Sequence, residues 1–137
     1  MAEKILVIDD EMDMLMMLRM LIEENTGYSV ETTNNPSEGL RRLSDEPFDL
    51  VITDLKMPAM DGLELFLELK KTAPTLPVII ITAYGSQEVA DEAIREGITD
   101  FITKPFKKDR ILFSIQRSLE LARLRKENEE LRGKASK

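Results

Sequence analysis

The sequence predicts an α/β fold in which short buried strands alternate with helices. Two observations predict it: apolar runs of strand length recur along the chain, and a stretch with helical periodicity follows each of them. Runs of consecutive apolar residues, such as residues 5–8 and 78–81, are typical of parallel strands covered on both faces. The chain has 137 residues, 42% of them hydrophobic, so it is long enough for one such domain and too short for two ordinary ones.

The expected strands lie at residues 5–8, 28–33, 49–53, 78–82 and 100–103, and the expected helices at residues 11–25, from 36 onward, 62–72, 86–96 and 107–132. The second strand is the most polar and is expected at a sheet edge. Asn35 and Pro36 are typical of a helix N-cap and first position, Ser86 caps the fourth helix, and Gly97 ends it. The third helix is amphipathic, with the apolar side chains Leu63, Phe66, Leu67 and Leu69.

Repeated βα units imply right-handed crossovers and a mostly parallel sheet with helices on both faces. Five strands fit the flavodoxin-like, doubly wound (βα)₅ fold with strand order 2-1-3-4-5, here with an extended C-terminal helix. In such sheets ligands bind beyond the carboxyl ends of the strands, near the point where the strand order reverses. Functional residues are therefore expected at the strand ends.

Cysteine and histidine are both absent from the sequence. Their absence excludes disulfides, thiolate nucleophiles, thiolate metal sites, His-dependent triads and His-ligated zinc. If this chain takes part in phosphohistidine chemistry, the histidine belongs to a partner. The apolar run at residues 5–8 is too short for a signal peptide or a membrane span, so we expect a cytoplasmic protein that does not enter the membrane.

The net charge of −7 is unevenly distributed. Residues 1–106 hold 9 basic and 21 acidic side chains, whereas residues 107–137 hold 10 and 5. An acidic body argues against direct nucleic-acid binding through phosphate contacts. The mixed signs of the basic tail are typical of a solvated helix face.

Polar side chains stand at the carboxyl ends of four predicted strands. Asp9 and Asp10 follow the first strand, Asp54 the third, Thr82 ends the fourth, and Lys104 follows the fifth. Because these ends meet at one sheet edge, we expect the side chains to lie together. Oxygen ligands without histidine or cysteine favour Mg²⁺. The charges of three carboxylates, one Mg²⁺ and one lysine sum to zero. Such a site could accept one phosphoryl group, because Mg²⁺ and the lysine both stabilise its oxygens. A carboxylate could act as the nucleophile.

Four segments carry a family resemblance: VIDDE at residues 7–11, VITDLKMPAMDG at 51–62, IITAYGS at 80–86 and DFITKPF at 100–106. In this order they resemble the receiver domain of two-component response regulators, over residues 4 to about 120. We therefore expect a receiver domain at residues 1–120 and a helical linker at residues 121–137. The resemblance implies phosphorylation by a sensor histidine kinase.

The resemblance also implies a role for each residue of the acidic group. Asp54 matches the phosphoacceptor, Asp10 a direct Mg²⁺ ligand, and Asp9 a ligand that acts mainly through water. Lys56 matches the position whose backbone carbonyl binds Mg²⁺. Lys104 matches the lysine that contacts the phosphoryl oxygens.

A conformational switch is implied as well. Thr82 matches the hydroxyl that moves toward the phosphoryl group, and Phe101 the aromatic side chain that turns inward with it. Thr82 also fits an ordinary strand end, and Phe101 ordinary packing on the sheet. Pro105 matches a residue that usually follows a cis peptide. Tyr84 is expected at the mouth of the site or simply exposed on its loop.

The first predicted helix is rich in methionine, at positions 12, 14, 16, 17 and 20. Helical periodicity puts Leu15, Leu18 and Ile22 on the core face. Met16, Met17 and Met20 fall on the other side. Exposed methionines form an adaptable contact surface. The resemblance to receiver domains implies that this helix docks the kinase, so we expect these methionines to join that contact. The alternative is that they pack against neighbouring side chains or are merely tolerated at the surface.

The last helix is expected to extend beyond the end of the domain. Leu121, Leu124, Asn128 and Leu131 have the spacing of an a-d-a-d seam, with Glu120 and Glu127 at g positions and Arg125 and Arg132 at e positions. An Asn at an a position and opposite charges at g and e favour a short parallel coiled coil between two copies. A solvated extension is the alternative, and Gly133 could close the helix. The whole pattern resembles regulators of the NtrC class, in which an ATPase module that activates transcription follows the receiver.

We therefore expect a signalling switch rather than an enzyme. Phosphorylation of Asp54 with Mg²⁺ would change dimerisation through the C-terminal helix, and through the face of the fourth helix, fifth strand and fifth helix, to control transcription. One alternative is a dimerisation module that ignores phosphate. Another is a Mg²⁺-dependent phosphatase with an aspartyl nucleophile, which would need an Asp-x-Asp signature where Asp9 and Asp10 are adjacent.

Overall fold

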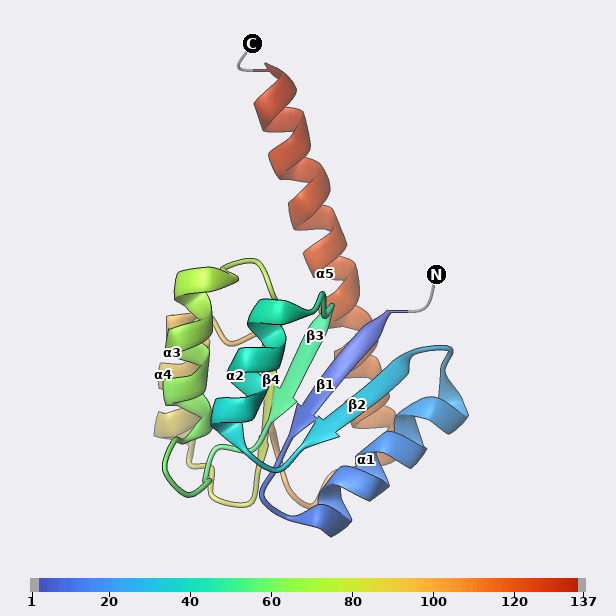
Figure 1. The fold of residues 1–137 in the computed structure, drawn as a ribbon, viewed down its shortest axis with the longest axis vertical. Coiled ribbons are helices and arrows are strands. Elements are labelled where there is room, and N and C mark those ends of the chain that lie inside the picture. Colours follow the sequence, from blue (N-terminus) through green and yellow to red (C-terminus); the bar gives the residue numbers. More distant parts are fainter. Residues whose placement is uncertain (1–2, 136–137) are drawn as a thin grey trace.

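The computed structural model describes residues 3–135 and confirms the predicted succession of strands and helices (Figure 1). The strands are β1 (Lys4–Ile8), β2 (Ser29–Thr33), β3 (Leu50–Thr53), β4 (Val78–Thr82) and β5 (Asp100–Thr103). The helices are α1 (Met12–Asn25), α2 (Pro36–Asp45), α3 (Gly62–Thr72), α4 (Gln87–Glu96) and α5 (Lys108–Ala135). Within residues 3–135, no helix is long and apolar enough to cross a bilayer.

The five strands form one parallel sheet in the order β2-β1-β3-β4-β5, as predicted. β1 pairs with both β2 and β3, so the strand order reverses beside it. Ile8 is the register partner of Thr53, and Asp9 and Asp54 therefore follow adjacent strand ends. The topology alone brings two of the predicted site residues together at the switch point.

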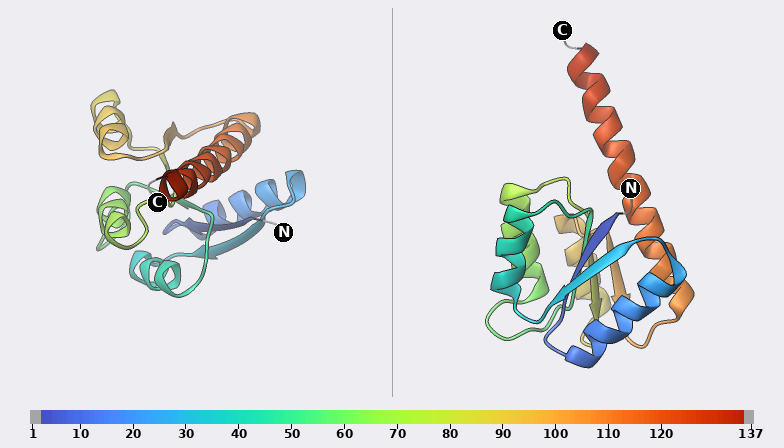
Figure 2. Two further views of the ribbon diagram at one scale, coloured as in Figure 1. Left: turned by 90° about the horizontal axis from the view of Figure 1, so that it is seen from above. Right: turned by 45° about the vertical axis from the view of Figure 1, so that its right-hand side comes forward.

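Each face of the sheet carries its own apolar core. α1 and α5 cover one face, with Leu15, Leu18 and Ile22 of α1 buried against β1 as predicted. α2, α3 and α4 cover the other face, where Phe66 packs with Ala93. The view from above in Figure 2 shows these two helix layers on either side of the sheet.

The three predicted helix caps are present in the structure. The Asn35 side chain accepts hydrogen bonds from the backbone N–H groups of Ser37 and Glu38, at 2.9 and 3.1 Å. The Ser86 hydroxyl accepts from Val89 N–H at 3.2 Å. Gly97 ends α4 with a φ of 116°, which favours glycine.

The structure adds detail to two of the predicted helices. In α3, Leu65, Phe66 and Leu69 are buried because they share the helix face that meets the sheet, whereas the apolar Leu67 is exposed. α5 does not close at Gly133 but continues to Ala135, since a glycine permits the closing conformation without imposing it. The predicted e position of Arg132 falls on a side chain outside the described ones.

α5 is fixed to the start of β5 by one carboxylate. Asp100 accepts two hydrogen bonds from the Arg110 guanidinium, at 2.8 and 3.1 Å, and one from the Ser114 hydroxyl at 2.6 Å. Burial opposes ionisation of Asp100, but these hydrogen bonds outweigh it and lower its pKa. Beyond this anchor, the C-terminal half of α5 runs clear of the domain (Figure 1).

Candidate functional site

Asp9 is the buried member of the acidic pair that follows β1. Its carboxylate accepts a hydrogen bond from Glu11 N–H at 2.9 Å, and its own N–H donates to the Thr33 carbonyl at 3.3 Å. Asp10 is exposed. The two adjacent acids therefore occupy different environments, one inside the site and one at its mouth.

Asp54 is buried at the end of β3 and held by both neighbouring segments. Its N–H donates to the Ile8 carbonyl at 3.1 Å, which ties it to the end of β1. Its Oδ1 accepts from Lys56 N–H at 3.2 Å. This loop backbone fixes the orientation of the predicted acceptor.

Lys104 supplies the positive charge of the site. Its Nζ lies 3.2 Å from Asp54 Oδ2 and 3.5 Å from Asp9 Oδ2. Its N–H donates to the Thr82 carbonyl at 2.9 Å, and the peptide to Pro105 is cis, as the resemblance implies. Lysine and carboxylates from three strands thus converge on one place.

Burial and charge shift the pKa values of this group in opposite directions. Burial raises the pKa of Asp9 to about 6, although the Glu11 N–H and the Lys104 charge oppose the shift. Desolvation would lower the pKa of Lys104, but the charges of Asp9 and Asp54 outweigh it and raise that pKa. Lys104 is therefore a cation at neutral pH.

The donor set fits a hard divalent cation. Asp9, Asp10 and Asp54 each offer a carboxylate oxygen, and these oxygens lie within 4.8 Å of one another. One lysine against three carboxylates leaves negative charge that a divalent ion would balance. Oxygen ligands suit Mg²⁺ better than zinc or copper.

The residues to which the resemblance assigns the conformational switch lie at the end of β4 and beside the loop that follows it. Thr82 is buried, and its Oγ1 accepts from Tyr84 N–H at 3.1 Å. Tyr84 itself is exposed on the loop. Phe101 is half-buried against the α4 side of the sheet, and a Cβ built on Gly85 would lie only 2.5 Å from its ring. The ring therefore rests against the loop that begins at Thr82.

Two residues in the loop after Asp54 were not assigned a role from the sequence. A Cβ on Gly62 would overlap the Asp54 carbonyl and come within 3.2 Å of Leu55 Cα, so only glycine fits there. Ala59 has a φ of 72°, and Met60 N–H donates to the Pro58 carbonyl at 2.8 Å across a tight turn. The Asp-Gly pair marks a turn in the sequence, but no sequence signal marks the strain at Ala59.

The fold and the acidic site define a domain of the receiver type. The chain belongs to the response regulator receiver domain family, whose model matches residues 5–116. Its relatives are regulators of the NtrC class. Membership implies phosphorylation-dependent signalling, and response regulators of this kind are generally not enzymes in the ordinary sense.

Similar proteins and structures extend this comparison. The transcriptional regulatory protein GlrR of Escherichia coli (strain K12) is 44% identical over 116 residues, which cover 85% of this chain and 26% of GlrR. A crystal structure of NtrX from Brucella abortus in complex with ADP matches with a TM-score of 0.88 and 38% identity, covering 96% of this chain and 30% of that one.

A receiver domain dimer is also among the similar structures. The solution structure of the beryllofluoride-activated NtrC4 receiver domain dimer matches with a TM-score of 0.82 and 32% identity, covering 87% of this chain and 98% of that one. The present chain spans only about a quarter of the length of the curated relatives that it matches.

Proposed function

We propose that Asp54 accepts a phosphoryl group from a sensor histidine kinase, with Mg²⁺ held by Asp9, Asp10, Asp54 and the backbone carbonyl of Lys56. The observation that carries this proposal is the convergence of three carboxylates within 4.8 Å, with Lys104 Nζ 3.2 Å from Asp54. The sequence has no histidine, so the phosphohistidine is the partner's.

In the transfer, an Asp54 oxygen bonds to phosphorus while the bond between phosphorus and the donor nitrogen breaks. Bound Mg²⁺ would supply positive charge to the phosphoryl oxygens. Lys104, now paired with Asp54 Oδ2, would exchange that contact for a phosphoryl oxygen. Burial of the acceptor keeps both electrostatic contacts strong, because water screens them less there.

The switch that we propose acts through the hydrogen bond between Thr82 and the loop after β4. If the Thr82 hydroxyl moves to the phosphoryl group, its Oγ1 gives up the N–H of Tyr84, 3.1 Å away. The loop is then free to rearrange at Gly85, where it contacts the Phe101 ring. Phosphorylation would thereby shift an existing equilibrium between two arrangements of loop and ring.

The output we propose is a change in the pairing of two copies. We divide the chain into a receiver at residues 1–120 and a helical linker at 121–137. The linker leucines Leu121, Leu124 and Leu131 are exposed, and a second copy would bury them in a parallel seam. Ile94 of α4 and Phe113 of α5 are also exposed, which supports a second contact on the α4–β5–α5 face.

Pairing would in turn control transcription. The curated relatives are several times longer than this chain and are named as transcriptional regulators. We propose that pairing acts on a downstream ATPase module, in the cytoplasm, with no direct contact between this chain and nucleic acid.

Analytical ultracentrifugation with and without beryllofluoride would test whether two copies pair. We expect Leu124→Glu to weaken the pairing, because Leu124 lies in the seam. Leu67→Glu is the control, because Leu67 is an exposed leucine outside the seam.

Intact mass after incubation with acetyl phosphate and Mg²⁺ tests the acceptor directly. We expect one phosphoryl adduct on the wild type and none on Asp54→Asn. No adduct on either protein would favour the module that ignores phosphate. An adduct on both would place the nucleophile elsewhere, and repeated turnover of a phosphomonoester would indicate the phosphatase.

A further inference from the structure

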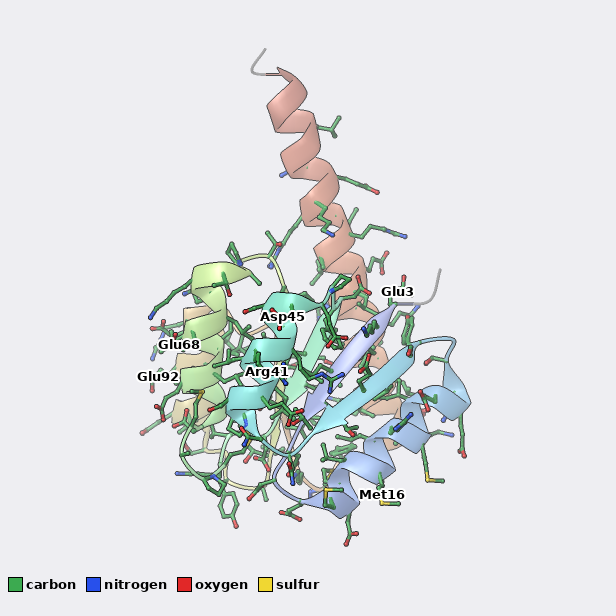
Figure 3. All side chains as sticks on the ribbon, in the orientation of Figure 1. Glu3, Met16, Arg41, Asp45, Glu68 and Glu92 are labelled. Atoms are coloured by element: carbon green, nitrogen blue, oxygen red, sulfur yellow. The ribbon has the colours of Figure 1, made fainter. Side chains whose placement is uncertain are left out.

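The outward face of α1 is a stripe of methionines. Met12, Met16 and Met20 follow one another at intervals of one helical turn and are 58%, 60% and 56% exposed. Met17 lies beside them and is 39% exposed. Figure 3 labels Met16 on the side of α1 away from the sheet. We call these four side chains the methionine stripe.

The stripe holds the most exposed methionines among residues 3–135. Met57, below the Asp54 loop, is only 9% exposed, and Met14 and Met60 are partly buried. The sequence contains no cysteine, which would otherwise be the preferred target of oxidants. A mild oxidant therefore meets the stripe before any other sulfur of the described chain.

The stripe begins at the rim of the acidic site. α1 starts directly after Asp10 and Glu11, both exposed at the carboxyl edge of the sheet. A protein that brings a phosphohistidine to Asp54 must cover this rim, whereas acetyl phosphate need not touch it. The exposed charges beside the stripe are mostly acidic, since Arg19 pairs with Glu23 while Asp13 and Glu24 add further negative charge. This favours a donor surface that is apolar with a basic border.

We propose that the methionine stripe is a site of reversible oxidation, at which peroxide converts its thioethers to sulfoxides and thereby weakens docking of the phosphodonor protein. This inference rests on the proposed function, which supplies the donor. The apolar thioethers suit an adaptable contact surface, while sulfoxides are polar and must lose their hydration to be buried in one.

The oxidation step is balanced by the peroxide alone. A sulfur lone pair attacks one peroxide oxygen, the O–O bond breaks, and an S–O bond forms. The other oxygen takes up the proton from the transferred oxygen and leaves as water. Sulfur is oxidised and the peroxide is reduced, and methionine sulfoxide reductases reverse the change.

The test compares two phosphodonors on oxidised protein. The full chain is treated with hydrogen peroxide, catalase removes the excess, and peptide mass spectrometry locates the sulfoxides. Phosphorylation is then measured with acetyl phosphate and with the sensor kinase domain that transfers fastest to untreated chain. We expect kcat/KM for the kinase reaction to fall roughly tenfold, with the acetyl phosphate rate within about twofold of the untreated value. Sulfoxide reductases should restore the kinase reaction.

Variants separate the stripe from other targets. A chain in which all four methionines of the stripe are changed to Leu keeps an apolar face, so peroxide should no longer slow its reaction with the kinase. The same four positions changed to Gln should mimic the oxidised chain. Met57→Leu is the control for the buried sulfur and should remain sensitive to peroxide.

Kinase transfer that stays unchanged after the stripe is oxidised would overturn the inference, as would a four-leucine chain that peroxide still slows. Failure of acetyl phosphate to modify even the untreated chain would instead count against the proposed function. The two failures are therefore distinguishable.

Discussion

Asp9→Asn should make the metal-free protein more stable at neutral pH, even though it removes a residue of the site. The Asp9 carboxylate is buried beside Asp54, and the cation that faces it is Lys104, 3.5 Å away. Asparagine has nearly the same shape, and its side-chain oxygen can still accept the N–H of Glu11. The substitution therefore removes mainly the cost of burying a negative charge.

The size of the effect follows from the pKa of Asp9. Burial raises this pKa from 3.8 to about 6, and each pKa unit corresponds to about 1.4 kcal/mol, so ionisation costs the fold at most about 3 kcal/mol. Because the folded chain binds this proton more tightly than the unfolded chain, the stabilisation by protonation is complete below pH 3.8. It is lost as the pH rises to about 6.

Urea unfolding in EDTA would measure the gain. We expect Asp9→Asn to be more stable than the wild type by about 1–3 kcal/mol at about pH 7.5, with most of the difference gone near pH 4. Asp10→Asn is the matched control, because the exposed Asp10 carboxylate should gain much less. Saturating Mg²⁺ should then stabilise the wild type by roughly 2–3 kcal/mol and Asp9→Asn by less.

Equal stability of Asp9→Asn and wild type at neutral pH would refute this reasoning. A gain of the same size at acid pH would refute it as well, because the neutral carboxyl of the wild type would then be as costly as the charged one.

Three glycine and alanine substitutions test the loops around the site. The Cβ of Gly62→Ala would overlap the Asp54 carbonyl, so this variant should lower the free energy of unfolding in urea by about 2–4 kcal/mol. Gly27→Ala is the control: a Cβ there meets nothing within 4 Å, so the free energy of unfolding should change by less than about 1 kcal/mol. Ala59→Gly relieves a φ of 72° and should raise the free energy of unfolding by up to about 1 kcal/mol; a loss would contradict the strain. Gly85→Ala puts a Cβ 2.5 Å from the Phe101 ring, so the ring resonances should shift in NMR spectra, and unchanged spectra would count against the contact.

The sequence predicts the meeting of the site residues because topology does most of the placing. Asp9, Asp54 and Lys104 each follow a parallel strand, and the ends of such strands share one edge whatever the side chains are. The roles of the site residues stay predictions, because they concern a bound metal ion or a phosphorylated state. These residues are Asp9, Asp10, Asp54, Lys56, Thr82, Phe101 and Lys104.

Other features depend on contacts between segments and leave no local signal. Asp9 and Asp10 are the same residue type in adjacent positions, yet Asp9 is buried and Asp10 is exposed. The buried Asp9 is held by hydrogen bonds from the Glu11 N–H and to the Thr33 carbonyl of the neighbouring strand. Gly62 is constrained by a carbonyl eight positions earlier in the chain. Ala59 adopts its conformation because the surrounding loop requires it, since alanine itself disfavours a positive φ.

Because α5 is anchored near its start by Asp100, a small tilt there moves the far end of the helix over a larger distance. Asp100 adjoins Phe101 in β5 and holds Arg110 and Ser114 in the first two turns of α5. The part of α5 past Ser114 is about 32 Å long at 1.5 Å per residue, so a tilt of about 10° at the anchor would displace its tip by about 5–6 Å. If two copies pair as we propose, a rearrangement too small to disturb the core would bring their leucine seams together or move them apart at the far end of α5.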